Sequence, residues 1–347
     1  MRLYIYQNRH IQNIVSSIQK NDYVVLENNF SIHLWKTFFD YNNMNYIEKT
    51  INYITMKKYL SEEFKMKFEK KFDVVLGNPP YQLQVGPNNT QTIWHKIVER
   101  CLEVLKYSGT MTMIHPDSWR TSPDKNFESI KKMLLSRTLV SLEMFDEAQG
   151  MKTFGASTPY DIYTLINEPN LDNKKTRIVG SDGVVMEKYL SHTDYIPNGL
   201  FDSFDPLWIK NGEEKVKTIS DSTYHTQRLY MSSEKNSDFK HPCVYTTTKD
   251  GSINFRYSNV KKGHFGVPKV IWSNGMASSV VVDKDGQYGL TQFAFAIVDE
   301  PENLEMIKKA MESEKFLELM QYSQGKNQRY NRRVIALFKK DFWKEFV

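Results

Sequence analysis

The first 170 residues alternate short apolar runs with segments whose apolar residues recur at helical spacing. A continuous apolar run of four to eight residues is typical of a strand buried on both faces of a sheet. This alternation predicts an α/β domain with a largely parallel sheet. The expected strands are residues 2–6, 23–26, 72–76, 110–115, 139–145 and 160–167, and the expected helices include most of 31–70, 92–105 and 127–135.

The pattern changes after Asn170, where Gly, Pro, Asn and Ser become frequent and the apolar runs shorten. Turn signals such as Asp250-Gly251 and Asp285-Gly286 punctuate this part, whereas 301–322 has the apolar spacing of one helix. We therefore expect two domains. Residues 1–170 form the α/β domain, and residues 171–347 form a β-rich α+β region suited to recognition.

The composition narrows the class of protein without naming a function. Hydrophobic residues make up 40% of the chain and charged residues 25%, which is sufficient for a globular core. The net charge of +5 is compatible with nucleic acid but not diagnostic of it. Two cysteines without a metal or disulfide pattern, and no long apolar run, predict a cytoplasmic protein with no membrane partner.

The segment Asn78-Pro79-Pro80-Tyr81 follows the apolar strand that ends at Gly77. An amino group on a planar base is a poor nucleophile, because its lone pair is delocalised into the ring. Two acceptors aimed at its N–H bonds favour the tetrahedral nitrogen, and Asn78 Oδ1 and the Pro79 carbonyl can provide them. The prolines restrict the backbone, and Tyr81 can stack on a base. The alternative is an ordinary Pro-Pro turn.

Residues 72–119 resemble the adenine-specific N6 DNA methyltransferases of type II restriction-modification systems, including phage forms. The resemblance rests on residues 77–82, 92–99, 105–109 and 114–116, and it extends over most of the chain from residue 70 onward. It implies a Rossmann-like class I methyltransferase sheet, S-adenosylmethionine as methyl donor, and double-stranded DNA as partner. It also implies a target-base pocket that contains His115, Trp119 and Phe154, although simple packing explains Trp119 equally well.

The donor site that this resemblance implies is incomplete, since residues 1–76 contain no glycine and no proline. The family places a glycine-rich loop after its first strand and acids after the next two. The positions that correspond to the acids are Gln7 and Asn29-Phe30, so amides replace both acids. Gly77 is a further candidate donor-binding residue. The sheet is therefore expected to be incomplete at the N-terminus. The chain is a donor-deficient relic, one half of a split enzyme whose second chain supplies the donor site, or a binder of unusual arrangement.

The C-terminal tail combines cations with aromatic residues, which indicates either a phosphate-binding patch on DNA or a solvated helix face with its aromatics packed inward. The histidines of the chain, among them His10, His33, His225 and His264, show no metal-ligand spacing, so no metal is expected. The candidate DNA-binding residues of the tail are Lys326, Arg329, Arg332, Arg333, Lys339 and Lys340.

Three functions from different classes remain open. The first is a site-specific DNA adenine-N6 methyltransferase of a restriction-modification or phage system. The second is a relic or partner subunit that binds DNA without methylating it alone. The third is methylation of RNA or protein amino groups by the same turn. The large recognition region and the basic tail count against a glutamine substrate, which needs less surface.

Overall fold

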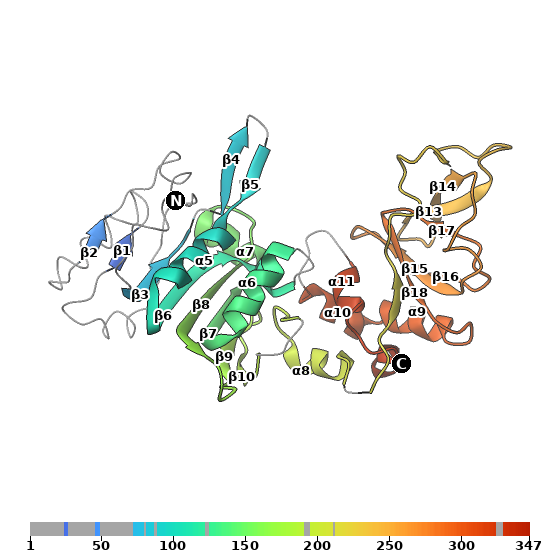
Figure 1. The fold of residues 1–347 in the computed structure, drawn as a ribbon. Coiled ribbons are helices and arrows are strands. Elements are labelled where there is room, and N and C mark those ends of the chain that lie inside the picture. Colours follow the sequence, from blue (N-terminus) through green and yellow to red (C-terminus); the bar gives the residue numbers. More distant parts are fainter. Residues whose placement is uncertain are drawn as a thin grey trace. The chain divides into compact units, whose positions relative to one another are not determined.

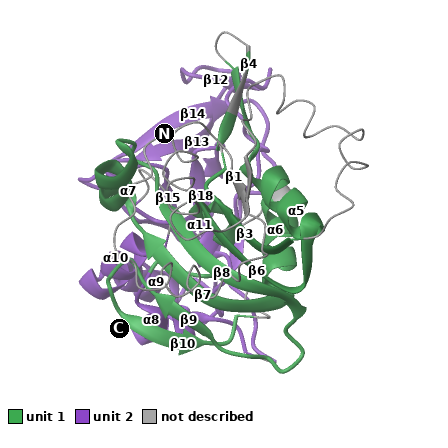
Figure 2. Cartoon of the chain, turned by 90° about the vertical axis from the view of Figure 1, so that its left-hand side faces the viewer, with its two compact units in different colours: residues 1–198 green, residues 199–347 purple. Residues whose placement is uncertain are grey.

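The computed structural model describes residues 24–26, 46–48, 72–79, 81–86, 89–121, 125–190, 195–210, 212–323 and 329–347. The chain forms two compact units, residues 1–198 and 199–347 (Figure 2). The boundary lies beyond residue 170, because two further strands extend the sheet of the first unit. Among the described residues, none of the helices has the length and apolar character needed to span a bilayer.

The first unit is built on a six-stranded sheet of order β10-β9-β7-β8-β6-β3 (Figure 1). The β3–β6 and β7–β9 pairs are parallel, whereas β8 runs antiparallel to both β6 and β7, and β9 and β10 form an antiparallel hairpin. The α/β class is therefore confirmed, but the expectation of a largely parallel sheet is wrong for the described strands. The strands are β3 (Phe72–Gly77), β6 (Leu105–Pro116), β7 (Arg137–Phe145), β8 (Tyr160–Pro169), β9 (Thr176–Val179) and β10 (Val185–Lys188).

Helices cover both faces of this sheet, with α5 and α6 on one face and α7 on the other (Figures 1 and 2). The apolar stripe of α5 is buried, as its helical spacing predicts. Phe72, Val75, Met111 and Leu142 supply part of the core beneath the helices. The helices are α5 (Trp94–Val104), the 3₁₀ helix η1 (Asp117–Thr121), α6 (Lys125–Leu135) and α7 (Glu147–Phe154).

Two short pairs of strands accompany the main sheet. A hairpin of β4 (Gln82–Gly86) and β5 (Asn89–Thr92) follows the Asn-Pro-Pro-Tyr segment directly and stands away from the sheet (Figure 1). The sequence pattern did not predict this hairpin. Near the N-terminus, β1 (Val24–Leu26) and β2 (Tyr46–Glu48) pair in parallel. The first of these was expected to be a strand, whereas the second lies in a segment expected to be mostly helical.

The second unit contains two four-stranded sheets of order β11-β18-β15-β16 and β12-β14-β13-β17. Their pairings are antiparallel except for β13 with β17. Val244, Ile271, Leu290 and Ala296 form a buried cluster that joins the two sheets. The strands are β11 (Lys217–Ile219), β12 (Met231–Ser232), β13 (His241–Thr247), β14 (Ile253–Ser258), β15 (Lys269–Ser273), β16 (Val281–Asp283), β17 (Gly289–Leu290) and β18 (Ala294–Val298).

Short helices complete the second unit and confirm its α+β character. The single helix expected over 301–322 is wrong, because Ser313 has extended backbone angles and divides it. The Ser313 side chain accepts a hydrogen bond from Phe316 N and so begins the second helix. The helices are α8 (Phe201–Phe204), the 3₁₀ helix η2 (Asp205–Leu207), α9 (Leu304–Glu312), α10 (Glu314–Gln321), α11 (Arg332–Ile335) and the 3₁₀ helix η3 (Phe342–Glu345).

Candidate functional site

Four strand ends meet at one edge of the first unit's sheet. Gly77 at the end of β3 pairs with Met113, three residues before the end of β6. Tyr160 at the start of β8 pairs with Pro116 on one side and with Phe145, the last residue of β7, on the other. The segment that follows Gly77 therefore begins at the edge where β6 and β7 end. Ligands of open α/β sheets bind beyond the carboxyl ends of parallel strands, so this edge is the candidate site.

The Asn78-to-Tyr81 turn is packed into this edge. Pro79 is buried, Asn78 is half-buried and its Oδ1 atom is shielded from solvent. The Tyr81 carbonyl accepts a hydrogen bond from Ile93 N at 3.1 Å, which closes the base of the β4–β5 hairpin against the turn. Pro80 lies outside the described residues. The backbone on both sides of the turn is therefore fixed by β3 and by the start of α5.

The Tyr81 hydroxyl is buried and has no hydrogen-bond partner among the residues that the structure describes. Burial raises the pKa of Tyr81, and the nearby Tyr160 and Asp161 raise it further. Tyr81 therefore lies close to Tyr160 and Asp161 at the start of β8. Tyr81 is therefore a neutral phenol at physiological pH, and its ring rather than its charge is available to a ligand.

His115, a predicted pocket residue, is fully buried at the end of β6. Its Nδ1 lies 3.0 Å from the Pro116 carbonyl oxygen, so Nδ1 carries the proton, and Nε2 accepts from the Tyr163 hydroxyl at 3.1 Å. Its ring stacks on Trp94 with centroids 4.0 Å apart. Burial lowers the pKa of His115 to about 3. His115 is thus a neutral, doubly hydrogen-bonded part of the packing and no general base at neutral pH.

Trp119, the second predicted pocket residue, is held by a carboxylate that the sequence analysis did not single out. Asp161 Oδ2 accepts from Trp119 Nε1 and from Arg120 Nε, each at 2.7 Å, and all three side chains are fully buried. Burial raises the pKa of Asp161, and the two donors oppose that rise. The available signal was Asp161, the single acid of residues 160–167, because a buried charge requires a partner.

Arg120 extends this cluster along the chain. Its Nη1 donates to the carbonyls of Ile196 and Pro197 at 3.0 and 3.3 Å, and its Nη2 donates to Asn198 Oδ1 at 2.7 Å. Asp117 lies 3.6 Å from Arg120 Nη2, and burial raises its pKa to about 7. One buried cation therefore faces two carboxyl groups. Asp161 forms the closer pair with Arg120, at 2.7 Å against 3.6 Å for Asp117.

Phe154, the third predicted pocket residue, lies at the end of α7 against aromatic rings of the strand ends. Its ring meets Tyr160 edge-on at 4.9 Å between centroids, and Tyr160 stacks on Phe145 at 4.5 Å. A capping box between Asp146 and Gln149 fixes the start of α7, and Gly155 ends it with φ +68°. The structure therefore brings Tyr81, Phe154 and Trp119 to the same sheet edge, because all three are linked through neighbouring β8 residues.

Residues 2–151 match the family model of the Eco57I restriction-modification methylases. This match includes the Asn78-to-Tyr81 turn and confirms the resemblance stated from the sequence. An uncharacterized adenine-specific methylase of Mycoplasma pneumoniae (strain ATCC 29342 / M129 / Subtype 1) is 27% identical, over 43% of this chain and 41% of its own length. The chain thus matches about two fifths of the length of this relative.

Solved structures of restriction-modification proteins also resemble the chain. The type IIL enzyme MmeI, solved in complex with DNA, has a TM-score of 0.47 at 10% identity, over 89% of this chain and 52% of MmeI. The type IIG restriction endonuclease BpuSI has a TM-score of 0.44 at 8% identity, over 96% of this chain and 59% of BpuSI.

The predicted donor-binding residues are described only in part. Gln7, Asn29 and Phe30 lie outside the described residues. Gly77 is described, and a Cβ at this position would lie 2.6 Å from Met113 Sδ. A side chain at this position would therefore displace the flexible end of the Met113 side chain. The role of Gly77 toward the donor stays a prediction.

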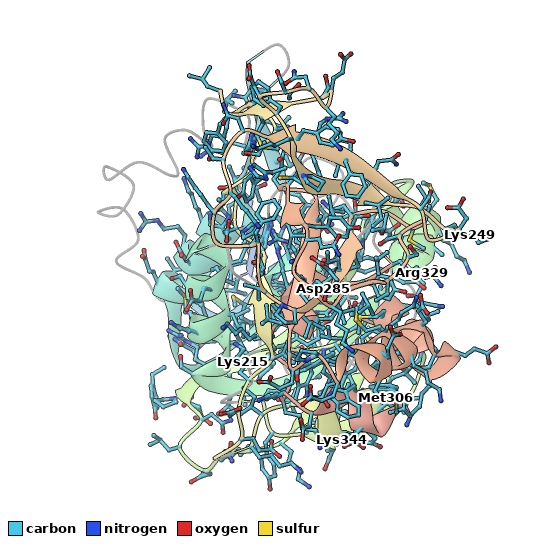
Figure 3. All side chains as sticks on the ribbon, turned by 90° about the vertical axis from the view of Figure 1, so that its right-hand side faces the viewer. Lys215, Lys249, Asp285, Met306, Arg329 and Lys344 are labelled. Carbon is cyan, nitrogen blue, oxygen red and sulfur yellow. The ribbon has the colours of Figure 1, made fainter. Side chains whose placement is uncertain are left out.

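The basic tail is folded into the second unit. Tyr330, Phe338 and Phe342 are buried around Phe316, as the inward-packing alternative describes. Arg329 donates to the Ser278 carbonyl and is half-buried (Figure 3).

The remaining cations of the tail differ in their partners. Lys339 and Lys340 form ion pairs with Glu345 and Glu214. Arg332 lies over the Phe295 ring, whereas Arg333 is exposed. Lys326 lies outside the described residues. Two of the predicted phosphate-binding side chains are thus engaged with carboxylates, and DNA binding by the tail stays a prediction.

Proposed function

We propose that the chain is a site-specific DNA methyltransferase that modifies the N6 amino group of a flipped adenine. The observation that carries the proposal is the position of the Asn78-to-Tyr81 turn, which follows β3 at the sheet edge where Trp119 and Phe154 lie. The family match over residues 2–151 supports the same chemistry.

In this proposal the turn acts by accepting hydrogen bonds and by stacking. Asn78 Oδ1 and the Pro79 carbonyl accept from the two N–H bonds of the amino group and favour its tetrahedral form. The Tyr81 ring lies on the face of the flipped base, and Phe154 lines the pocket. S-adenosylmethionine is the methyl source that the proposal requires. Methyl transfer is direct, without a covalent enzyme intermediate.

A methylation assay tests the role of the turn. The purified chain is incubated with isotopically labelled S-adenosylmethionine and DNA, and the product nucleosides are analysed for N6-methyladenine. We expect Asn78→Ala to abolish methylation without lowering the melting temperature. Tyr81→Phe retains activity because the hydroxyl has no partner among the described residues, whereas Tyr81→Ala loses it. Tyr107→Ala, at a tyrosine that is 76% exposed on β6, provides the matched control.

The same assay decides between nucleic acid and protein substrates. RNA and a cell protein extract are offered in parallel with DNA. Labelled RNA or labelled protein glutamine in the absence of labelled DNA would reject the proposed substrate while retaining the chemistry of the turn. Full activity of Asn78→Ala on DNA would reject the assigned acceptor.

A second candidate function is that of a DNA-binding partner subunit without a donor site of its own. The observation that favours it is the absence of glycine and proline from residues 1–76, with the amides Gln7 and Asn29 at positions where the family has acids. Calorimetric titration with S-adenosylmethionine separates the two candidates. Saturable binding supports a complete enzyme, and DNA binding without any heat of donor binding supports the partner subunit.

A further inference from the structure

One leucine of the second unit is almost completely exposed. Leu229 is 99% exposed, and residues 222–231, here called the Leu229 loop, contain no Asp or Glu. Single exposed leucines are common on protein surfaces. The surroundings of the loop therefore decide whether this one has a role.

The Leu229 loop is held from two sides by hydrogen bonds. The buried Tyr224 hydroxyl donates to the Lys262 carbonyl at 2.9 Å and accepts from Lys262 N at 2.5 Å. Thr226 N donates to Gln292 Oε1 at 3.0 Å, and Gln292 Nε2 returns a bond to Thr226 Oγ1 at 2.9 Å. A loop fixed in this way loses little conformational entropy when its apex meets a partner.

Three exposed cations belong to the loop and to the segment that is hydrogen-bonded to it. Two turns place Arg228 and Leu229 at the apex, since Arg228 N donates to the His225 carbonyl and Met231 N donates to the Arg228 carbonyl. Arg228 is exposed. The neighbouring segment 259–263 contributes the exposed Lys261 and Lys262 and contains no acid. Asn259 N donates to the Tyr230 carbonyl at 3.1 Å, and Lys262 Nζ lies 4.9 Å from the Tyr230 ring. Lys262 thus lies beside the loop, Arg228 is an exposed cation at its apex, and Lys261 Nζ lies 5.7 Å from the Phe265 ring.

We infer that the Leu229 loop is a contact for duplex DNA, in which Leu229 enters a groove and Arg228, Lys261 and Lys262 neutralise phosphates. The inference rests on the proposed function and deepens it by naming a DNA contact in the second unit. Phosphate neutralisation by Arg and Lys supplies affinity, and apolar side chains that enter a groove pack against base edges or between base steps. Arg228, Lys261 and Lys262 favour this polyanion over a protein partner, and Asp221, the acid that directly precedes the loop, is hydrogen-bonded to Thr223 N and to His264 Nε2.

The experiment measures binding of the full chain to a fluorescently labelled duplex of random sequence by anisotropy, over a series of salt concentrations. Leu229→Ala raises the Kd about tenfold, because the buried area of a leucine is lost. Leu229→Met preserves affinity. Leu171→Ala, in a turn of the first unit where Leu171 is 88% exposed, leaves the Kd unchanged.

The charges are tested by a triple substitution of Arg228, Lys261 and Lys262 to Gln. The slope of log Kd against log salt falls by about three, since each cation accounts for about one phosphate. Lys309→Gln, at an exposed lysine of α9, is the matched control and leaves the slope unchanged.

Other outcomes overturn the inference. Equal Kd values for Leu229→Ala and Leu171→Ala would overturn the loop contact while leaving the proposed function intact. Binding to phosphatidylserine vesicles that Leu229→Ala abolishes, with unchanged DNA binding, would identify a membrane contact instead. Absence of DNA binding and of DNA methylation by the unsubstituted chain would overturn both the loop contact and the proposed function.

Discussion

Replacing Asp161 by Asn tests whether the buried carboxylate fixes the wall of the candidate pocket. Asp161 Oδ2 accepts from Trp119 and Arg120 at 2.7 Å, and the ion pair is fully buried on both sides. An amide oxygen in place of Oδ2 keeps both hydrogen bonds but removes the charge. The amide nitrogen then takes the place of Oδ1, which is buried and has no partner among the described residues.

The expected loss follows from the burial of the pair. Removing one partner of a buried ion pair costs about 3–5 kcal/mol, because the other charge is left uncompensated. Asp117, 3.6 Å from Arg120, can ionise in response and brings the expected loss to the lower end, about 3 kcal/mol. The matched control is Asp73→Asn. Asp73 lies 2.6 Å from Lys106, but the two side chains are 43% and 47% exposed, so this change costs less than about 1 kcal/mol.

Urea unfolding at pH 7, followed by circular dichroism, measures both variants against the unsubstituted chain. A double variant that adds Arg120→Gln closes a thermodynamic cycle, and we expect a coupling energy above about 1 kcal/mol for a pair in direct contact. If Asp161→Asn and Asp73→Asn lost the same free energy of unfolding, the carboxylate would have no special role in the pocket wall.

Two further predictions concern the same sheet edge. The pKa of Asp117 is raised to about 7, so its contribution to stability is present at low pH and is lost as the pH rises through 7. The pKa of His115 is lowered to about 3, so its contribution to stability is present at neutral pH and is lost as the pH falls. Urea unfolding at both pH values measures the change in the free energy of unfolding on going from pH 7 to 5. Relative to the change in the unsubstituted chain, Asp117→Asn should lose about 2 kcal/mol more stability. His115→Gln should lose about 2 kcal/mol less. Gly150→Ala should lower the melting temperature more than Gly155→Ala. A Cβ at Gly150 would lie 2.1 Å from the Thr158 carbonyl oxygen, whereas a Cβ at Gly155 meets open space and costs only about 1 kcal/mol of left-handed strain; equal melting temperatures would contradict this packing.

The sequence predicts elements well where the apolar spacing is regular. The helix expected at 92–105 is α5, and the strand expected at 139–145 is part of β7. The interval from Met311 to Phe316 is five residues instead of three or four, and this irregular step coincides with the break at Ser313. Apolar runs do not encode strand direction. The antiparallel insertion of β8 between β6 and β7 therefore required the structure.

In the candidate site too, local features could be predicted from the sequence, whereas pairing between distant residues could not. The Asn78-to-Tyr81 turn was evident from four consecutive residues, because local rigidity and acceptor groups are local properties. Asp161 and Arg120 were not found, because their pairing joins positions 41 residues apart and depends on the register of β8 against β6. Side-chain pairing across a sheet is a tertiary property. A lone charge within an apolar strand indicates only that some partner exists.

The two parts of the site are positioned by different forces, and this difference separates their expected mutational effects. The turn is fixed through its backbone, by β3 and by the hydrogen bond from Ile93 N to the Tyr81 carbonyl. Its side chains are therefore replaceable without loss of the fold, and variants of Asn78 should alter methylation alone. Trp119 and Arg120, by contrast, are held by the buried carboxylate of Asp161. Variants there should alter stability first and methylation as a consequence, so a comparison of the two classes of variant distinguishes chemistry at the turn from support of the pocket.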